Sequence, residues 1–145
     1  MGAILDKDGI KKIIPHRDPI LLIDEVSEMK IGEDIKTKYY VSGEMEIFKG
    51  HFPGDPVLPG VYTVECMAQT ADVLILSMER YAGKTPLFIG IDKVKFKKKI
   101  EPGDTIEVYA KIIKENVEKA IVVCEATAFN KGEEAAVGEV ALAMR

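Results

Sequence analysis

The chain has 145 residues, a length that suits one globular domain with its own buried core rather than two full domains. Lysine and arginine total 20 against 24 aspartate and glutamate residues, which gives a formal net charge of −4. This balance provides no overall positive field for a polyanion and disfavours a general nucleic-acid binder. Cys66 and Cys124 each lie in an apolar run, without a second thiol or a histidine at metal-ligand spacing. We therefore expect a reduced, cytosolic setting.

Charges at residues 6–8 interrupt the apolar core that a secretory signal needs, so we expect no export signal. The longest weakly charged stretch, Val57 to Met78, is long enough to raise the question of a membrane span. Four residues inside it argue instead for a buried helix in a soluble protein: Pro59, Glu65, Gln69 and Asp72.

The first half of the chain predicts one short helix and two strands. Leu5 to Ile13 has isoleucines at helical spacing and ends before Pro15, which predicts a short amphipathic helix. Ile20 to Met29 is predicted as a strand, and Ile35 to Ser42 alternates as a second strand rich in β-branched and aromatic residues. Gly43 to Pro59 contains GHFPGDPVLP, whose glycines and prolines indicate a loop held in one shape.

One long central helix is predicted from Gly60 to about Tyr81, with Ala82-Gly83 as its stop. Polar turns then separate four predicted antiparallel strands: Leu87 to Ile100, Thr105 to Lys114, Ala120 to Phe129 and Ala135 to Arg145. The fold class is therefore α+β, with a sheet that must cover the helix. Because the helix is apolar nearly all round, either the sheet curls around it or a second subunit covers the rest.

Glu65 is the first candidate for chemistry. It falls in the second turn of the predicted helix among apolar residues, with no cation within one turn. A carboxylate there is costly unless it is paired, hydrogen-bonded or protonated, which makes Glu65 a candidate acid near neutral pH. The alternative is that Glu65 points into water at an exposed helix end.

His51 is the second candidate, in the loop before the helix. An isolated loop histidine is commonly structural or solvated, and that alternative stays open here. The glycines and prolines around it nevertheless make a rigid segment beside a helix N-terminus, where catalytic groups can be positioned. Gly60 adds a backbone N–H at the positive end of the helix, suited to an anion or a developing oxyanion.

A base, an acid and an oxyanion donor thus lie within 15 residues, from His51 to Glu65. This set suits abstraction of a proton next to a carbonyl with departure of a hydroxyl. Ser77 and Cys66 are the competing nucleophiles, but both fall in the apolar helix with no histidine nearby in sequence. Core packing is the better interpretation for each.

The chain resembles the FabZ-type 3-hydroxyacyl-[acyl-carrier-protein] dehydratases in three segments that follow in matching order: IIPHRDPILLIDEV, GHFPGDPVLPGVYTVECMAQ and FIGIDKVKFKKKIEPGD. The resemblance runs from about Ile13 to Asp104, and the family's active-site signature falls on His51, Gly60 and Glu65. It implies one hot-dog domain over residues 1–145, a long helix wrapped by a curved antiparallel sheet. It also implies a homodimer, commonly assembled into a hexamer as a trimer of dimers, with His51 facing Glu65 of the partner subunit.

By the same resemblance, the chain is a cytoplasmic hydro-lyase of fatty acid elongation. His51 removes the C2 proton of the (3R)-3-hydroxyacyl thioester, and the Gly60 N–H steadies the thioester oxygen. Glu65, directly or through a water, protonates the departing hydroxyl, and trans-2-enoyl thioester results without a metal or cofactor. Gln69, one helical turn beyond Glu65, either holds that acid or a water or has no chemical role. The residues expected at the substrate site beside Gly60 are Phe52, Val61 and Gln69.

Glu65, in place of the aspartate of related FabA-type enzymes, favours a dehydratase without isomerase activity. The chain departs from the family's usual residues at Asp18, at Glu44-Met45 and at the pair Lys97 and Lys98. These departures affect the expected acyl-chain preference and loop contacts. We assign no role to His16, which lies between a proline and an arginine and is expected to be a structural turn residue.

Five lysines gather between Lys93 and Lys99 in an otherwise acidic chain. On a strand, Val94 and Phe96 would face inward and alternate lysines would line the outer side. The simple interpretation is a solvated strand face. The resemblance favours a docking patch for acyl carrier protein, which is acidic and delivers its phosphopantetheine arm. The residues expected in this patch are Arg17, Lys95, Lys97 and Lys99.

Two rival functions remain from the sequence. The first is another enzyme on the same fold, an acyl-CoA thioesterase or a hydratase, and a thioesterase would release free thiol. The second is a non-catalytic module that binds an acyl carrier or a lipid, for which His51 and Glu65 would be dispensable. The intact signature at both residues disfavours the second.

Overall fold

A computed structural model describes residues 3–145. The helical elements are α1 (Lys7–Lys11), α2 (Gly60–Leu76) and two short 3-10 turns, η1 (Glu46–Lys49) and η2 (Glu79–Tyr81). The strands are β1 (Glu25–Lys30), β2 (Asp34–Tyr40), β3 (Pro86–Phe96), β4 (Thr105–Asn116), β5 (Ile121–Asn130) and β6 (Glu133–Met144).

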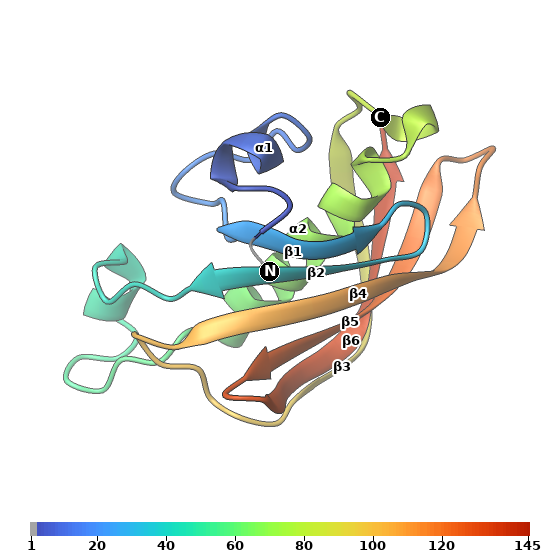
Figure 1. The fold of residues 1–145 in the computed structure, drawn as a ribbon. Helices are drawn as coiled ribbons and strands as arrows, with labels where there is room; N and C mark the ends of the chain where they lie inside the picture. The colour runs from blue at the N-terminus through green and yellow to red at the C-terminus, as the bar shows by residue number, and fades with distance from the viewer. Residues whose placement is uncertain (1–2) are drawn as a thin grey trace.

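All six strands form one antiparallel sheet in the order β1-β2-β4-β5-β6-β3, shown in Figure 1. The antiparallel pairing predicted for the late strands is confirmed. The expectation that all four would be sequential neighbours is wrong for β3, which pairs with β6 at the edge of the sheet while β4 pairs with β2. The connection 97–104 therefore crosses from one part of the sheet to another, which puts residues just after β3 near the start of α2.

The sheet curves around α2, as Figure 1 shows. Every residue from Thr63 to Leu76 except Glu65 is buried within the single chain, whereas Val61 in the first turn is 72% exposed. The chain itself, not a second subunit, therefore covers most of the apolar helix. This arrangement is the predicted hot-dog fold. Within residues 3–145, no helix is long and apolar enough to cross a membrane.

The central helix ends at Leu76, five residues before its predicted last residue, Tyr81. Ser77 caps it, because both its backbone N–H and its hydroxyl bond the carbonyl of Val73, at 3.1 and 2.6 Å. A local hydroxyl that satisfies a helix carbonyl competes with continuation of the helix. The chain then makes η2 before Gly83 turns it with a φ of +80°.

Strand β1 begins at Glu25 rather than at Ile20. Residues 20–22 are held by helix α2 instead of by the sheet: the Gln69 side chain bonds Leu22 N at 2.8 Å and Ile20 O at 2.7 Å. Cys66 Sγ also donates to Leu22 O at 3.2 Å. The apolar run 20–23, in which Leu21, Leu22 and Ile23 are buried, is therefore a segment packed on the helix, and its apolar character alone made it look like a strand.

Strand β3 does not alternate as predicted. Its pairing with β6 shifts between Asp92 and Lys95, and Lys93 lies in this irregularity with a φ of +54°. Such a bulge interrupts the strict alternation of side chains along a strand. Val94 packs against the core and the Phe96 ring reaches the start of α2 beside Gly60, so both face inward as predicted, and Phe96 is 56% exposed where it lines the cavity.

Candidate active site

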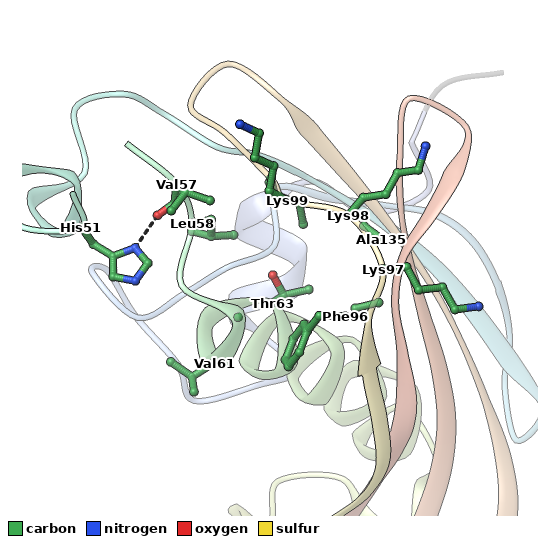
Figure 2. Close-up of a pocket in the computed structure, with 13 residues that line it drawn as sticks. His51, Val57, Leu58, Val61, Thr63, Phe96, Lys97, Lys98, Lys99 and Ala135 are labelled. Atoms are coloured by element: carbon green, nitrogen blue, oxygen red, sulfur yellow. Dashed lines mark hydrogen bonds between the residues drawn. The ribbon is translucent and has the colours of Figure 1, made fainter. Parts of the chain in front are cut away.

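A cavity of about 590 Å³ lies between the loop before α2, the first turn of α2 and the end of β3. Figure 2 shows His51 on one wall, Val61 and Phe96 on the floor, and Lys97, Lys98 and Lys99 on the side away from His51. The lining is mainly apolar, as expected for a site that takes an acyl chain.

The imidazole of His51 is oriented by its own loop. His51 Nδ1 lies 2.7 Å from the carbonyl oxygen of Val57, and Val57 N donates back to His51 O at 3.0 Å. Because a carbonyl oxygen can only accept, Nδ1 carries a proton, and in the neutral imidazole the lone pair is then on Nε2. The ring also stacks on Phe52, with centroids 3.9 Å apart. The loop thus presents a histidine in the tautomer that a general base at Nε2 requires.

Gly60 opens helix α2 at the cavity wall, after Pro59. The first N–H groups of a helix have no partner within the helix and lie at its positive end. A Cβ atom at position 60 would stand 2.9 Å from two carbon atoms of the Phe96 ring. Glycine thus lets the aromatic ring approach the first turn of α2 closely, and any larger residue here would force the ring to shift.

Glu65 is held by Gln69, one turn further along α2. Gln69 Nε2 donates to Glu65 Oε2 at 2.7 Å, while the remaining bonds of the amide go to the backbone of Ile20 and Leu22. These backbone bonds fix which end of the amide faces Glu65. Gln69 itself is fully buried, so in this chain it contacts Glu65 and not the open cavity.

Within one chain, the His51 cavity and Glu65 are separate. His51, Gly60 and Val61 line the cavity, but Glu65 and Gln69 do not. Phe52 stacks on His51 yet lines a neighbouring hollow instead, and half of its surface is exposed. A single chain therefore brings together the expected base and oxyanion donor without the expected acid.

The Glu65 carboxylate has a second polar neighbour that the sequence did not reveal. His16 Nε2 lies 3.9 Å from Glu65 Oε2 and 3.7 Å from Asp72 Oδ2. Burial lowers the pKa of His16, and the nearby Glu65 charge partly offsets this shift. Interpreting His16 only as a turn residue missed these contacts. The acids it faces are far away in the sequence, and its one local cue, a position between Pro15 and Arg17, is common to turns.

The two competing nucleophiles are packed in the core. Cys66 is 1% exposed, and burial raises the pKa of its thiol to about 12. The Ser77 hydroxyl donates its hydrogen bond to the carbonyl oxygen of Val73. Neither side chain is an activated nucleophile. In the part of the chain from residue 3 onward, no group of three or more histidine, cysteine, aspartate or glutamate residues forms a candidate metal site.

The three lysines that directly follow β3 each lie close to an acidic residue. Lys97 contacts Glu134 at 2.6 Å and Lys98 contacts Glu133, both from β6, and Lys99 lies 3.6 Å from Glu101. These pairs are solvent-exposed, so each contributes little and can exchange partners. The positive patch predicted from the sequence is thus offset by acids that the sheet brings alongside it.

The other two residues of the expected docking patch differ. Lys95 forms no salt bridge with any residue that the structure describes. The Arg17 guanidinium donates hydrogen bonds to three backbone carbonyl oxygens, those of Lys11 and Ile14 at 3.0 Å and that of His16 at 2.7 Å. Arg17 thus braces the segment that carries His16, and Lys95 is the freer cation.

The chain belongs to the FabA-like domain family, whose model matches residues 14–139. It is 55% identical over 113 residues to the 3-hydroxyacyl-[acyl-carrier-protein] dehydratase FabZ of Clostridium beijerinckii, covering 77% of this chain and 80% of the relative. It is 44% identical over 140 residues to the protein of the same name from Caldicellulosiruptor saccharolyticus, covering 97% and 99%. The likeness therefore spans both His51 and Glu65.

Solved structures with low sequence identity share the fold. The dehydratase heterocomplex ApeI:P from Xenorhabdus doucetiae superposes with a TM-score of 0.76 at 16% identity, over 94% of this chain and 90% of that one. A hypothetical thioesterase with coenzyme A from Streptococcus pneumoniae gives 0.62 at 10% identity, over 83% and 84%. Because a dehydratase and a hypothetical thioesterase both occur among these neighbours, the fold alone does not determine the reaction.

Proposed function

We propose that this chain dehydrates (3R)-3-hydroxyacyl-[acyl-carrier-protein] to the trans-2-enoyl thioester in fatty acid elongation, with His51 as base and Glu65 of the partner subunit as acid. The enzyme class follows from the dehydratases that match nearly the whole chain. The observation that carries the residue roles is the hydrogen bond from His51 Nδ1 to Val57 O, because it leaves Nε2 free as a base at the wall of the cavity.

The reaction removes one proton and one hydroxyl from adjacent carbons. His51 Nε2 takes the proton from C2, and the electron pair passes toward the thioester oxygen, where the Gly60 N–H stabilises the developing charge. Glu65 protonates the hydroxyl on C3 as the C3–O bond breaks, so that water leaves and the C2–C3 double bond forms. Gln69 keeps the Glu65 carboxyl oriented. The acyl group stays on its carrier throughout, and the chemistry calls for no metal or cofactor.

A homodimer is supported by the exposed face of β3. This strand lies at the end of the sheet, and several large apolar side chains on it are 47–59% exposed: Leu87, Ile89 and Ile91. A long, apolar edge strand is a template for pairing with another chain. Pairing through β3 would also bring a second subunit close to the end of that strand, which borders the His51 cavity. The family resemblance extends this dimer to a hexamer built as a trimer of dimers.

Acyl carrier protein is the proposed partner at the mouth of the cavity. Lys97 and Lys99 stand at the rim, and Lys95 is free among the described residues. An acidic partner can replace the exposed glutamates that hold the rim lysines, since such pairs are weak. Binding should therefore weaken with salt, because exposed charges are screened over about 8 Å at physiological ionic strength. A salt-independent affinity would contradict this docking surface.

The test is to incubate the purified protein with 3-hydroxyacyl carrier proteins of several chain lengths and to follow the acyl group by mass spectrometry. Loss of one water with the thioester intact supports the proposal. Release of free thiol would assign a thioesterase instead. No reaction at any chain length would leave the non-catalytic alternative and overturn the proposed activity.

A further inference from the structure

A second acid lies behind Glu65 on the same helix. Asp72 follows Glu65 by two helical turns, is only 2% exposed, and has no hydrogen-bond partner for its Oδ1 among residues 3–145. Burial raises the pKa of Asp72 well above its usual value. The reaction described above makes no use of this carboxyl. A buried carboxyl without a full set of partners is destabilising, so its presence needs an explanation.

His16 links the two acids through one atom. Its Nε2 lies 3.7 Å from Asp72 Oδ2 and 3.9 Å from Glu65 Oε2, and its Nδ1 is buried without a hydrogen-bond partner in the described chain. Both Nε2 distances exceed a direct hydrogen bond, so the imidazole must move by about one ångström to bond either acid. Because one nitrogen can serve one carboxyl at a time, the protonation states of the three groups are coupled.

The other groups around this cluster do not titrate in the same range. Cys124 faces Asp72 from β5, and burial together with the Asp72 charge raises the pKa of its thiol to about 12. Cys66, next to Glu65, is shifted in the same way. Arg17 follows His16 in the chain, and its guanidinium is bound to backbone carbonyls. Of the groups in the described chain that face the two acids, His16 is therefore the one suited to exchange a proton with them.

We propose that Asp72 and His16 form a positioning pair for Glu65, in which Asp72 supplies a proton to His16 and His16 holds the Glu65 carboxylate once it has reacted. When Glu65 has protonated the leaving hydroxyl, the Asp72 O–H bond breaks and an N–H bond forms at His16 Nε2. The imidazolium then donates to Glu65, and the negative charge that was on Glu65 alone is shared with Asp72. The proton returns to Asp72 when Glu65 is reprotonated from solvent. This inference rests on the proposed function, because it takes Glu65 as the acid.

Nuclear magnetic resonance can test the coupling directly, since His16 and His51 are the two histidines of the chain. Protein labelled with ¹⁵N-histidine gives two sets of imidazole signals, one for each ring, which His51→Gln assigns. Asp72→Asn keeps the size of the side chain but has no carboxyl proton to share. We expect the His16 ring to titrate at lower pH in this variant, because a neighbouring acid is lost. Titration curves for His16 that superimpose on those of the wild type would overturn the proposal.

Kinetics with the acyl-carrier substrate separates a positioning role from a structural one. Asp72→Asn should lower kcat about tenfold, leave KM within about twofold and change the shape of the kcat pH profile. The matched control is Thr70→Val on the same helix, which removes a buried hydroxyl bonded to Thr37 and to Cys66 O. It should lower stability without changing the pH profile. An unchanged kcat and pH profile in Asp72→Asn would contradict the inference.

Two further variants keep the outcomes distinct. If Asp72→Asn does not fold, His16→Gln at the more exposed end of the pair replaces it, with the same loss in kcat expected. Glu65→Gln tests the proposed function on which this inference rests: an active Glu65→Gln enzyme would refute that function itself. An inactive Glu65→Gln together with wild-type behaviour of both Asp72→Asn and His16→Gln would refute only the positioning pair.

Discussion

Gln69 donates a hydrogen bond of 2.7 Å to Glu65, and the same side chain is anchored by the backbone of the segment before β1. The Glu65 carboxyl is thus held by a helix side chain that is itself bonded to buried backbone, and not by a mobile surface group. Preorganisation of this kind limits the reorientation that a catalytic acid needs before it can transfer a proton. The orientation of Glu65 thus depends on a residue that is itself fully buried within the chain.

Gln69→Met should therefore lower kcat while leaving substrate binding nearly unchanged. The substitution keeps the length of the side chain but removes its donors, and a hydrogen bond to a charged group contributes about 1.5–3 kcal/mol, or roughly 10- to 100-fold in rate. Steady-state kinetics with 3-hydroxyacyl carrier protein measures the effect. Thr70→Val controls for loss of a buried hydrogen bond on the same helix. A Gln69→Met enzyme with wild-type kcat would show that Glu65 needs no such anchor.

Gly60→Ala tests the oxyanion donor and the packing around it. The new methyl group would stand 2.9 Å from the Phe96 ring, so ring and helix N-terminus must separate. Misplacing an oxyanion donor lowers kcat by roughly 10²-fold. The double variant Gly60→Ala with Phe96→Leu should recover part of the loss, because a smaller side chain relieves the clash. Failure of Phe96→Leu to restore any activity would indicate that the ring is not the cause.

Asp72→Asn should change how stability depends on pH. A carboxyl whose pKa is raised in the folded state binds protons more tightly there, so its stabilising effect is full below about pH 3.8 and is lost as pH rises through the folded-state value. The wild type should therefore lose unfolding free energy between pH 5 and pH 8 relative to Asp72→Asn. Urea unfolding at the two pH values measures this. A difference between the proteins that does not vary with pH would contradict the buried, protonated carboxyl.

Lys95→Glu tests docking of the acyl carrier protein. Lys95 is the lysine of the basic strand without an acidic partner among the described residues, so reversing its charge should raise KM for the carrier-bound substrate by about two- to fivefold at low salt. The difference from the wild type should shrink as salt is added. A short thioester substrate without the carrier protein is the control, and its KM should not change. Equal effects on both substrates would argue against a docking role.

The sequence predicts the parts of this molecule that depend on local pattern. The long helix and the predicted strands are found with only small shifts at most boundaries. The position of β3 could not be predicted, since pairing with β6 rather than β4 is decided by distant contacts and not by the strand's own residues. The early end of α2 depends on a single hydroxyl, that of Ser77.

The residues of the site likewise divide into those that the local sequence pattern reveals and those that it does not. His51, Gly60 and Glu65 were recognisable because the chain carries them at fixed spacing in one segment. His16 and Asp72 were not, because the relation between them exists only after the N-terminal segment packs against α2. The charge of the lysine-rich segment was instead overestimated from the sequence. Lys97 and Lys98 looked unopposed there, but the acids at the start of β6 lie alongside them.

The central claim is that each active site takes His51 from one subunit and Glu65 from the other. His51→Ala and Glu65→Gln homodimers should each be inactive. When the two variants are mixed, dissociated and reassembled, half of the dimers are mixed, and each holds one intact site and one doubly altered site. We predict recovery of about a quarter of wild-type activity. If both residues act within one chain, every site in the mixture lacks one of them, and the absence of any recovered activity would contradict the shared site.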